Sequence, residues 1–273
     1  MLADAALFAA GKKLKVYNTC STGTDHIDHK AAAVHGVRIL CIKEDIGLLN
    51  TFTATAECAF MLLLACFRKF RSVNRCAHAG DWLGAGRRYE GRQLSGKTMG
   101  ILGLGRLGKM TADYAKGFRM RVIGCDLLEI NRPGVESVSF DELLAQSDAI
   151  SIHVHMTHEN HHLLNRSTFA KMKHGAVLIN TSRGDVINEA DLINALDAGQ
   201  LSAFGSDVIH DEWRDDLEKS ELLQYAKAHD NVIFSPHIGG ATIETVAAAR
   251  LFSAKKLAHY LEIGEELHQH EGE

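Results

Sequence analysis

The chain has 273 residues, of which 46% are hydrophobic and 23% are charged, a composition typical of a soluble globular protein. Its formal net charge of −4 gives no general attraction to nucleic acid or to an anionic membrane, so we expect neither as a partner. The apolar start lacks the pattern of a secretory signal, and the six cysteines show no CxxC pairing, which predicts a cytoplasmic protein.

Two segments precede the main block of predicted strands. Residues 13–40 have the pattern of a short α/β piece. Residues 54–77 then carry apolar side chains at helical spacing, which predicts an amphipathic helix. Its longest apolar run, 58–67, is too short for a bilayer span. The apolar positions of this segment are Ala56, Phe60, Leu63, Leu64, Phe67, Phe70 and Val73.

From about residue 94, short apolar strands alternate with helical patterns. The strands are predicted at 98–102, 121–125, 149–153, 176–180, 203–208 and 232–235, with helices at 107–118, 141–146, 189–198 and, last, 241–263. Such alternation predicts an α/β fold with a doubly wound parallel sheet (Rossmann type). We expect this sheet domain at 73–239. A second, smaller, discontinuous α/β substrate lobe would consist of 1–72 and 240–273.

A glycine-rich loop directly follows the first strand of this block and precedes a helix. In such a loop Gly103 permits a tight turn, Gly105 lets the backbone approach a pyrophosphate, and Gly108 lets the helix pack closely on the strand. The alternative is a glycine-rich turn that binds nothing. The strand before the loop and the helix after it favour a dinucleotide site.

Two further features of this region fit a dinucleotide. The backbone N–H groups of Arg106 and Leu107 lie at the predicted helix N-terminus, where they can bind phosphate. Asp126 ends the next strand, and its carboxylate would accept hydrogen bonds from the adenosine ribose while repelling a 2′-phosphate. The sequence therefore predicts NAD as cofactor in preference to NADP.

Polar residues stand at the ends of three later strands. Arg183, Glu212 and His237 would lie outside the carboxyl ends of these strands, where doubly wound sheets bind their ligands. Taken singly, each has an ordinary explanation as a solvated loop charge or a loop histidine. Only their combination indicates a catalytic site.

The glycine loop, together with the segments INTSRGDVINEADL, GSDV and SPHIGGAT, resembles the D-isomer-specific 2-hydroxyacid dehydrogenase family, which includes glyoxylate/hydroxypyruvate reductases and phosphoglycerate dehydrogenases. The resemblance implies an NAD-dependent oxidoreductase that transfers a hydride between nicotinamide and C2 of a small D-2-hydroxy or 2-keto acid. It implies that Arg183 binds the substrate carboxylate and polarises the carbonyl. His237 would be the general acid–base, and Glu212 would orient its imidazole.

The resemblance also implies further binding residues. Beyond the glycine loop and Asp126, it assigns the cofactor to His153, Val154, His155, Thr181, Ser182, Asp207, His237, Gly239 and Gly240. It assigns the substrate to Thr22, Gly23, Thr24, Arg183 and His237. Segment 54–77 matches the helix through which family members form homodimers.

Departures from the family pattern leave other functions open. By that comparison the chain begins roughly fifty residues late, more than ordinary loop variation, so the substrate lobe is expected to be incomplete at its N-terminus. Trp213 replaces the proline that usually follows the glutamate. One alternative is an NAD(H)-sensing binding protein of the corepressor type on the same fold, and another is an inactive truncated homologue. No metal site is expected, because the histidines at 153–162 would not all point one way.

Overall fold

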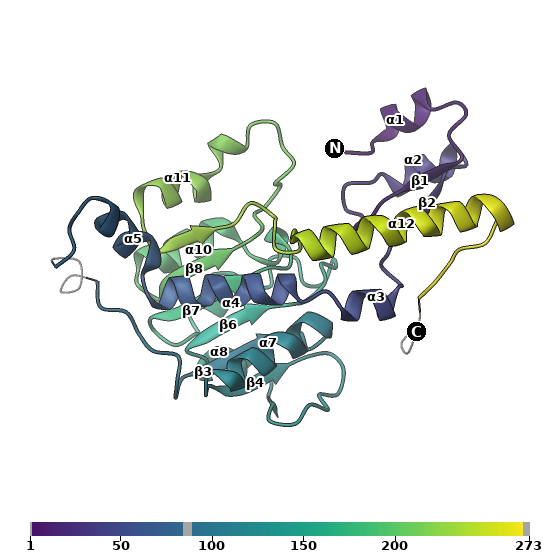
Figure 1. Ribbon diagram of the computed structural model, residues 1–273. Helices are drawn as coiled ribbons and strands as arrows, with labels where there is room; N and C mark the ends of the chain where they lie inside the picture. The colour runs from purple at the N-terminus through teal and green to yellow at the C-terminus, as the bar shows by residue number, and fades with distance from the viewer. Residues whose placement is uncertain (1, 84–88, 270–273) are drawn as a thin grey trace. The chain divides into compact units, whose positions relative to one another are not determined.

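The computed structural model describes residues 2–83 and 89–269, which form two compact units (Figure 1). The terminal unit consists of residues 1–52 and 240–273, and the sheet unit of residues 53–239. The predicted fold class is thereby confirmed: a doubly wound parallel sheet with a second, smaller and discontinuous α/β unit built from both chain ends.

The sheet unit contains seven parallel strands in the order β5-β4-β3-β6-β7-β8-β9. The first strand of the sheet is β3, and β4 and β5 are added on one side of it. The chain then returns to place β6 on the other side of β3 and continues outward through β7, β8 and β9. A crevice opens at such a switch point, outside the carboxyl ends of the two central strands, and ligands bind there. The strands are β3 (Thr98–Leu102), β4 (Arg121–Cys125), β5 (Glu136–Ser137), β6 (Ala149–Ile152), β7 (Ala176–Asn180), β8 (Leu201–Ser206) and β9 (Val232–Phe234).

Both faces of this sheet are covered by helices because successive strand residues point to opposite faces. Met99 and Ile101 pack in one core with α4 (Ala54–Phe67) and α7 (Arg106–Gly117). Leu102 belongs to the other core. The helices of this second face are α8 (Phe140–Gln146), α9 (Arg166–Phe169), α10 (Glu189–Asp197) and α11 (Glu221–Ala228).

Segment 54–77 differs from its prediction in two respects. It forms two helices, α4 and α5 (Phe70–His78), because Lys69 between them adopts a left-handed conformation with φ of 49°. It also belongs to the sheet unit, since α4 packs against β7, β8 and β9. The boundary between the units therefore lies after Phe52, not at the predicted position 72/73.

By length and composition alone, one stretch of the described chain, 46–67, could cross a membrane. It is not a single helix, because α3 (Ile46–Asn50) ends before α4 begins. Its longer part, α4, buries Phe60, Leu62 and Leu63 in the core of the sheet unit. The apolar character of α4 is thus explained by packing.

The terminal unit is smaller. Its strands β1 (Val16–Asn18) and β2 (Arg38–Leu40) pair in parallel, and its helices are α1 (Ala5–Ala10), α2 (His29–Val34), α3 and the long α12 (Ile243–Ile263).

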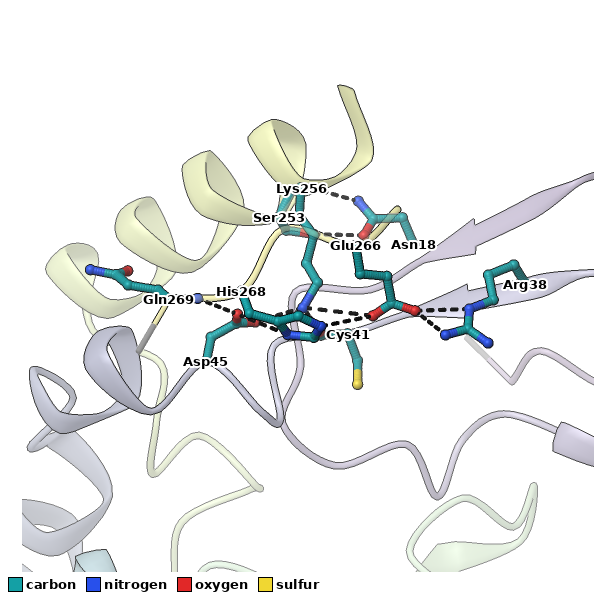
Figure 2. A network of polar contacts seen from close by, with 9 residues as sticks. All are labelled: Asn18, Arg38, Cys41, Asp45, Ser253, Lys256, Glu266, His268 and Gln269. Atoms are coloured by element: carbon teal, nitrogen blue, oxygen red, sulfur yellow. Dashed lines mark hydrogen bonds and ion pairs between the residues drawn. The ribbon is translucent and has the colours of Figure 1, made fainter. Parts of the chain in front are cut away.

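A buried ion pair joins the two chain ends within the terminal unit (Figure 2). Lys256 of α12 donates from Nζ to Asp45 at 2.9 Å and to the carbonyl oxygen of Cys41 at 3.0 Å. The Lys256 and Asp45 side chains are only 1% and 0% exposed. The segment after α12 covers this pair: the backbone N–H of Gln269 donates to Asp45, and Glu266 pairs with Arg38 (Figure 2). Because an unpaired buried charge is costly, this network holds the C-terminal segment against the N-terminal part of the unit.

Candidate functional site

The glycine loop has the shape that a bound pyrophosphate requires. Gly103 has φ of +90°, which L side chains rarely adopt, and a Cβ there would lie 2.9 Å from the carbonyl of His153. A Cβ on Gly108 would lie 2.0 Å from the carbonyl oxygen of Gly103, so only glycine lets α7 pack this closely on the loop. A Cβ on Gly105 would meet no described atom within 4 Å. The surface at Gly105 is therefore open beside the first turn of α7, where Arg106 and Leu107 present their backbone N–H groups.

Asp126 lies at the carboxyl end of β4, beside this loop. Its carboxylate accepts hydrogen bonds from the backbone N–H groups of Leu104 and Leu128. Each oxygen uses one acceptor position in this way and retains another for a ribose hydroxyl. Asp126 thus supports the glycine loop through the backbone N–H of Leu104. Its contact with the ribose stays a prediction.

The carboxyl end of β6 forms the other side of the switch point. His153 is half-buried, and burial lowers the pKa of its imidazole to about 4, so the ring is neutral at physiological pH. Its Nε2 pairs with the Ser151 hydroxyl at 2.9 Å. Val154 packs close to Gly103, whereas the side chain of His155 is exposed. His153 and Val154 thus lie against the glycine loop, and the contact of all three residues with a cofactor stays a prediction.

Arg183 lies in a turn that is stabilised by the buried side chain of Asn180. Asn180, at the end of β7, is 0% exposed; its amide donates to the carbonyl of Arg183 at 2.9 Å and accepts from the backbone N–H of Ser182 at 3.0 Å. The Arg183 guanidinium donates to the carbonyl of Ser182 at 2.7 Å. Within the described chain, the buried hydroxyl oxygen of Thr181 has no hydrogen-bond partner. A buried polar atom without a partner is costly, and a ligand beside β7 would satisfy it.

His237 and Glu212 form the central pair of the site. Nδ1 of His237 lies 2.5 Å from Oε1 of Glu212, and the two side chains are 43% and 17% exposed. Since a carboxylate only accepts, Nδ1 carries the proton and Nε2 remains to exchange a proton with a ligand. Glu212 raises the pKa of His237 above its usual value, against the opposing effects of burial and of the positive charge of Arg183.

The loop that carries His237 is held by Asp207, which is only 4% exposed. One oxygen of Asp207 accepts from the Ser235 hydroxyl at 2.5 Å and from the Ile238 N–H at 3.0 Å; the other accepts from the Gly239 N–H at 2.7 Å. The expected contact of Asp207 with nicotinamide stays a prediction. In this structure both of its oxygens support the loop.

The structure thus brings the predicted residues of the sheet unit to the carboxyl ends of neighbouring strands. Thr22, Gly23, Thr24 and Gly240 belong to the terminal unit, and their part in binding stays a prediction. Sequence reasoning missed the supporting roles of Asn180 and Ser235. Ser235 acts through a hydrogen bond to another strand end, which leaves no pattern in the sequence, and Asn180 acts within its own turn, where only its burial reveals the role.

The residues present fit a dinucleotide. The glycine loop leaves room at Gly105, the first turn of α7 offers N–H donors, and Asp126 stands at the next strand end. Among the described residues, no group of three or more histidine, cysteine, aspartate or glutamate side chains could hold a metal ion.

Comparison with known proteins also indicates a dinucleotide-binding domain. The sequence profile of the D-isomer specific 2-hydroxyacid dehydrogenase NAD binding domain matches residues 60–239. Hydroxypyruvate reductase of Thermotoga maritima is 36% identical over 246 residues, which are 88% of this chain and 75% of that protein.

Solved structures of 2-hydroxyacid dehydrogenases superimpose on the chain. A glyoxylate reductase from Paecilomyes thermophila superimposes with a TM-score of 0.81 at 32% identity, over 98% of this chain and 78% of that one. The D-lactate dehydrogenase of Aquifex aeolicus, solved with NAD and lactic acid, has a TM-score of 0.81 at 29% identity, over 95% of this chain and 80% of that one.

Replacing Gly105 by alanine should weaken NADH binding about tenfold or more, equivalent to about 1.4 kcal/mol, because the new methyl group occupies the space left for the pyrophosphate. The melting temperature should hardly change, since that methyl group meets no protein atom. Calorimetric titration with NADH measures the affinity. Gly117→Ala, at the far end of α7 with equally open space, is the matched control. Unchanged affinity in Gly105→Ala would place the pyrophosphate elsewhere.

Replacing Glu212 by glutamine should lower the pKa of His237, because the negative charge that stabilises the imidazolium is lost. The Trp213 ring lies 6.4 Å from the His237 ring, and a protonated imidazole quenches indole fluorescence. The chain has two tryptophans, so in a Trp82→Phe background the fluorescence of Trp213 reports the titration of His237. The midpoint should move to lower pH in Glu212→Gln and stay in place in Glu218→Gln, an exposed control. Equal midpoints in both would contradict the pairing.

Proposed function

The chain belongs to the D-isomer specific 2-hydroxyacid dehydrogenase family, and on that premise we propose that Arg183, Glu212 and His237 are its catalytic residues. It is an NAD-dependent oxidoreductase that transfers a hydride between nicotinamide and C2 of a small 2-hydroxy or 2-keto acid. The observation that supports our assignment is the 2.5 Å contact between Glu212 and His237, which raises the pKa of the imidazole.

Bound nicotinamide supplies the hydride in reduction and accepts it in oxidation. Arg183 binds the substrate carboxylate with its planar fork and polarises the C2 carbonyl, a task that suits a permanently charged guanidinium. The protonated His237 donates from Nε2 to the oxygen that becomes the hydroxyl. Glu212 keeps Nδ1 protonated and the ring oriented. In the reverse direction the neutral His237 accepts the hydroxyl proton.

The raised pKa of His237 fixes the pH dependence of the two directions. Reduction needs the imidazolium, so it should persist above the usual histidine range and fall as the pH rises through the pKa of His237. Oxidation needs the neutral ring, so it should rise over the same interval.

Asp126 supports a preference for NAD. A carboxylate at this strand end accepts from ribose hydroxyls and repels a 2′-phosphate. We also propose that Thr22, Gly23 and Thr24 hold the substrate carboxylate through backbone N–H groups, as the family resemblance implies.

We further propose that the protein is cytoplasmic and forms a homodimer through 54–77, without nucleic-acid or membrane partners. Met61 and Phe70 of this segment are 51% and 54% exposed, and large exposed apolar side chains on neighbouring helices indicate a protein contact. Sedimentation equilibrium at micromolar concentration tests the assembly, and a monomer would exclude it.

The activity is tested by following NADH consumption with glyoxylate, hydroxypyruvate, pyruvate and phosphohydroxypyruvate in parallel. His237→Ala should lower kcat by about 10²–10⁴-fold with at least one of these acids while leaving NADH affinity nearly unchanged, because it removes the proton donor alone. His174→Ala is the control, since His174 is exposed and precedes β7 at the opposite edge of the sheet. Equal turnover in His237→Ala would reject the catalytic assignment.

A further inference from the structure

His210 lies between β8 and Glu212, two positions before Glu212, and contacts two segments that follow Arg183. Its ring Nδ1 pairs with Oδ1 of Asp185, which is in the short 3₁₀ helix η1 (Gly184–Val186). Its backbone N–H donates to Oε1 of Glu189, the first residue of α10, at 2.9 Å. His210 therefore joins the loop that carries Glu212 to residues 185 and 189, at the two ends of the segment that follows Arg183.

The same two segments touch through their backbones. A Cβ on Gly184 would lie 2.1 Å from the carbonyl carbon of Ile209 and 2.3 Å from the backbone nitrogen of His210. Gly184 directly follows Arg183, and His210 precedes Glu212 by two positions. A displacement at this contact would therefore move both functional side chains.

Charged and titratable groups surround the His210 ring. The His162 ring lies 6.4 Å from it, and the His162 N–H donates to the Asp185 carbonyl at 2.8 Å. Burial raises the pKa of Glu189, while the hydrogen bond from His210 and the charges of His210 and Arg214 oppose that rise. The groups that contact or face His210 are thus His162, Asp185 and Glu189, and Arg214 acts on Glu189 from the same loop.

We propose that His210 is a positioning residue: through Asp185 and Glu189 it fixes the loop of Glu212 against the turn of Arg183. It does not touch the substrate. Its effect reaches the reaction by keeping Glu212 on His237 and by holding the turn that carries Arg183. This inference rests on the proposed function of those three residues.

Loss of the contact between His210 and Asp185 is expected to affect the reaction rate more than the free energy of unfolding. The His210 and Asp185 side chains are 49% and 40% exposed, so solvent screens their contact and it contributes little to the free energy of unfolding. A misplacement of about 1 Å at a catalytic group can cost about 10²-fold in rate. Loss of this contact should therefore reduce activity much more than stability.

The experiment compares His210→Ala and His210→Gln with the unaltered protein, using the keto acid that the unaltered protein reduces best. His210→Ala should lower kcat/KM about tenfold, leave NADH affinity unchanged and move the limb of the pH profile that reports His237 to lower pH. His210→Gln should recover most of the loss, because its side-chain N–H can still donate to Asp185. His174→Ala is the matched control, a histidine exposed at the opposite edge of the sheet.

A second readout does not need turnover. In the Trp82→Phe background, the Trp213 fluorescence midpoint should fall in His210→Ala and return toward the original value in His210→Gln. Unchanged kcat/KM and an unchanged midpoint in His210→Ala would overturn the proposal. So would an equal loss in His210→Gln with no movement of the midpoint. If the unaltered protein reduces no keto acid, the proposed function fails, and the fluorescence titration still decides whether His210 positions Glu212.

Discussion

The catalytic arrangement depends on one buried carboxylate. Asp207 accepts three hydrogen bonds from the loop 235–239, and these donors compensate for burying its charge. His237 in that loop has φ of 51°, a left-handed conformation that costs a non-glycine residue about 1–3 kcal/mol. The hydrogen bonds to Asp207 hold the loop in this shape. With the backbone so fixed, the His237 ring meets Glu212 on one nitrogen and leaves the other available.

The parallel sheet explains why residues so distant in sequence act together. Every strand of the sheet unit ends at the same edge, so the segments after β3, β6, β7, β8 and β9 gather there. The strand order turns back between β3 and β6, and the glycine loop stands at that point. The same topology therefore positions both the glycine loop and the Glu212–His237 pair.

The pairing of Glu212 with His237 favours an enzyme over a protein that only senses a dinucleotide. Binding of NAD requires the glycine loop, the first turn of α7 and an acid at the next strand end. It does not require a carboxylate that keeps an imidazole protonated above its usual pKa. A raised pKa serves proton transfer to a developing hydroxyl. The chemistry of the site therefore agrees with the activity of the family.

The sequence by itself determined the fold class, the glycine loop and the three polar strand ends, because these depend on local patterns: apolar periodicity, glycine spacing and short motifs. It did not determine the break at Lys69, since a left-handed residue between two helices leaves no periodic signal. It also misplaced the boundary between the units, because the affiliation of α4 is decided by the sheet it packs against. The roles of Asn180, Asp207 and His210 emerged only from tertiary structure. Asp207 and His210 act through hydrogen bonds to residues on other strands or loops, and Asn180 acts within a turn whose shape depends on burial at the end of β7. Such contacts exist only once the chain has folded.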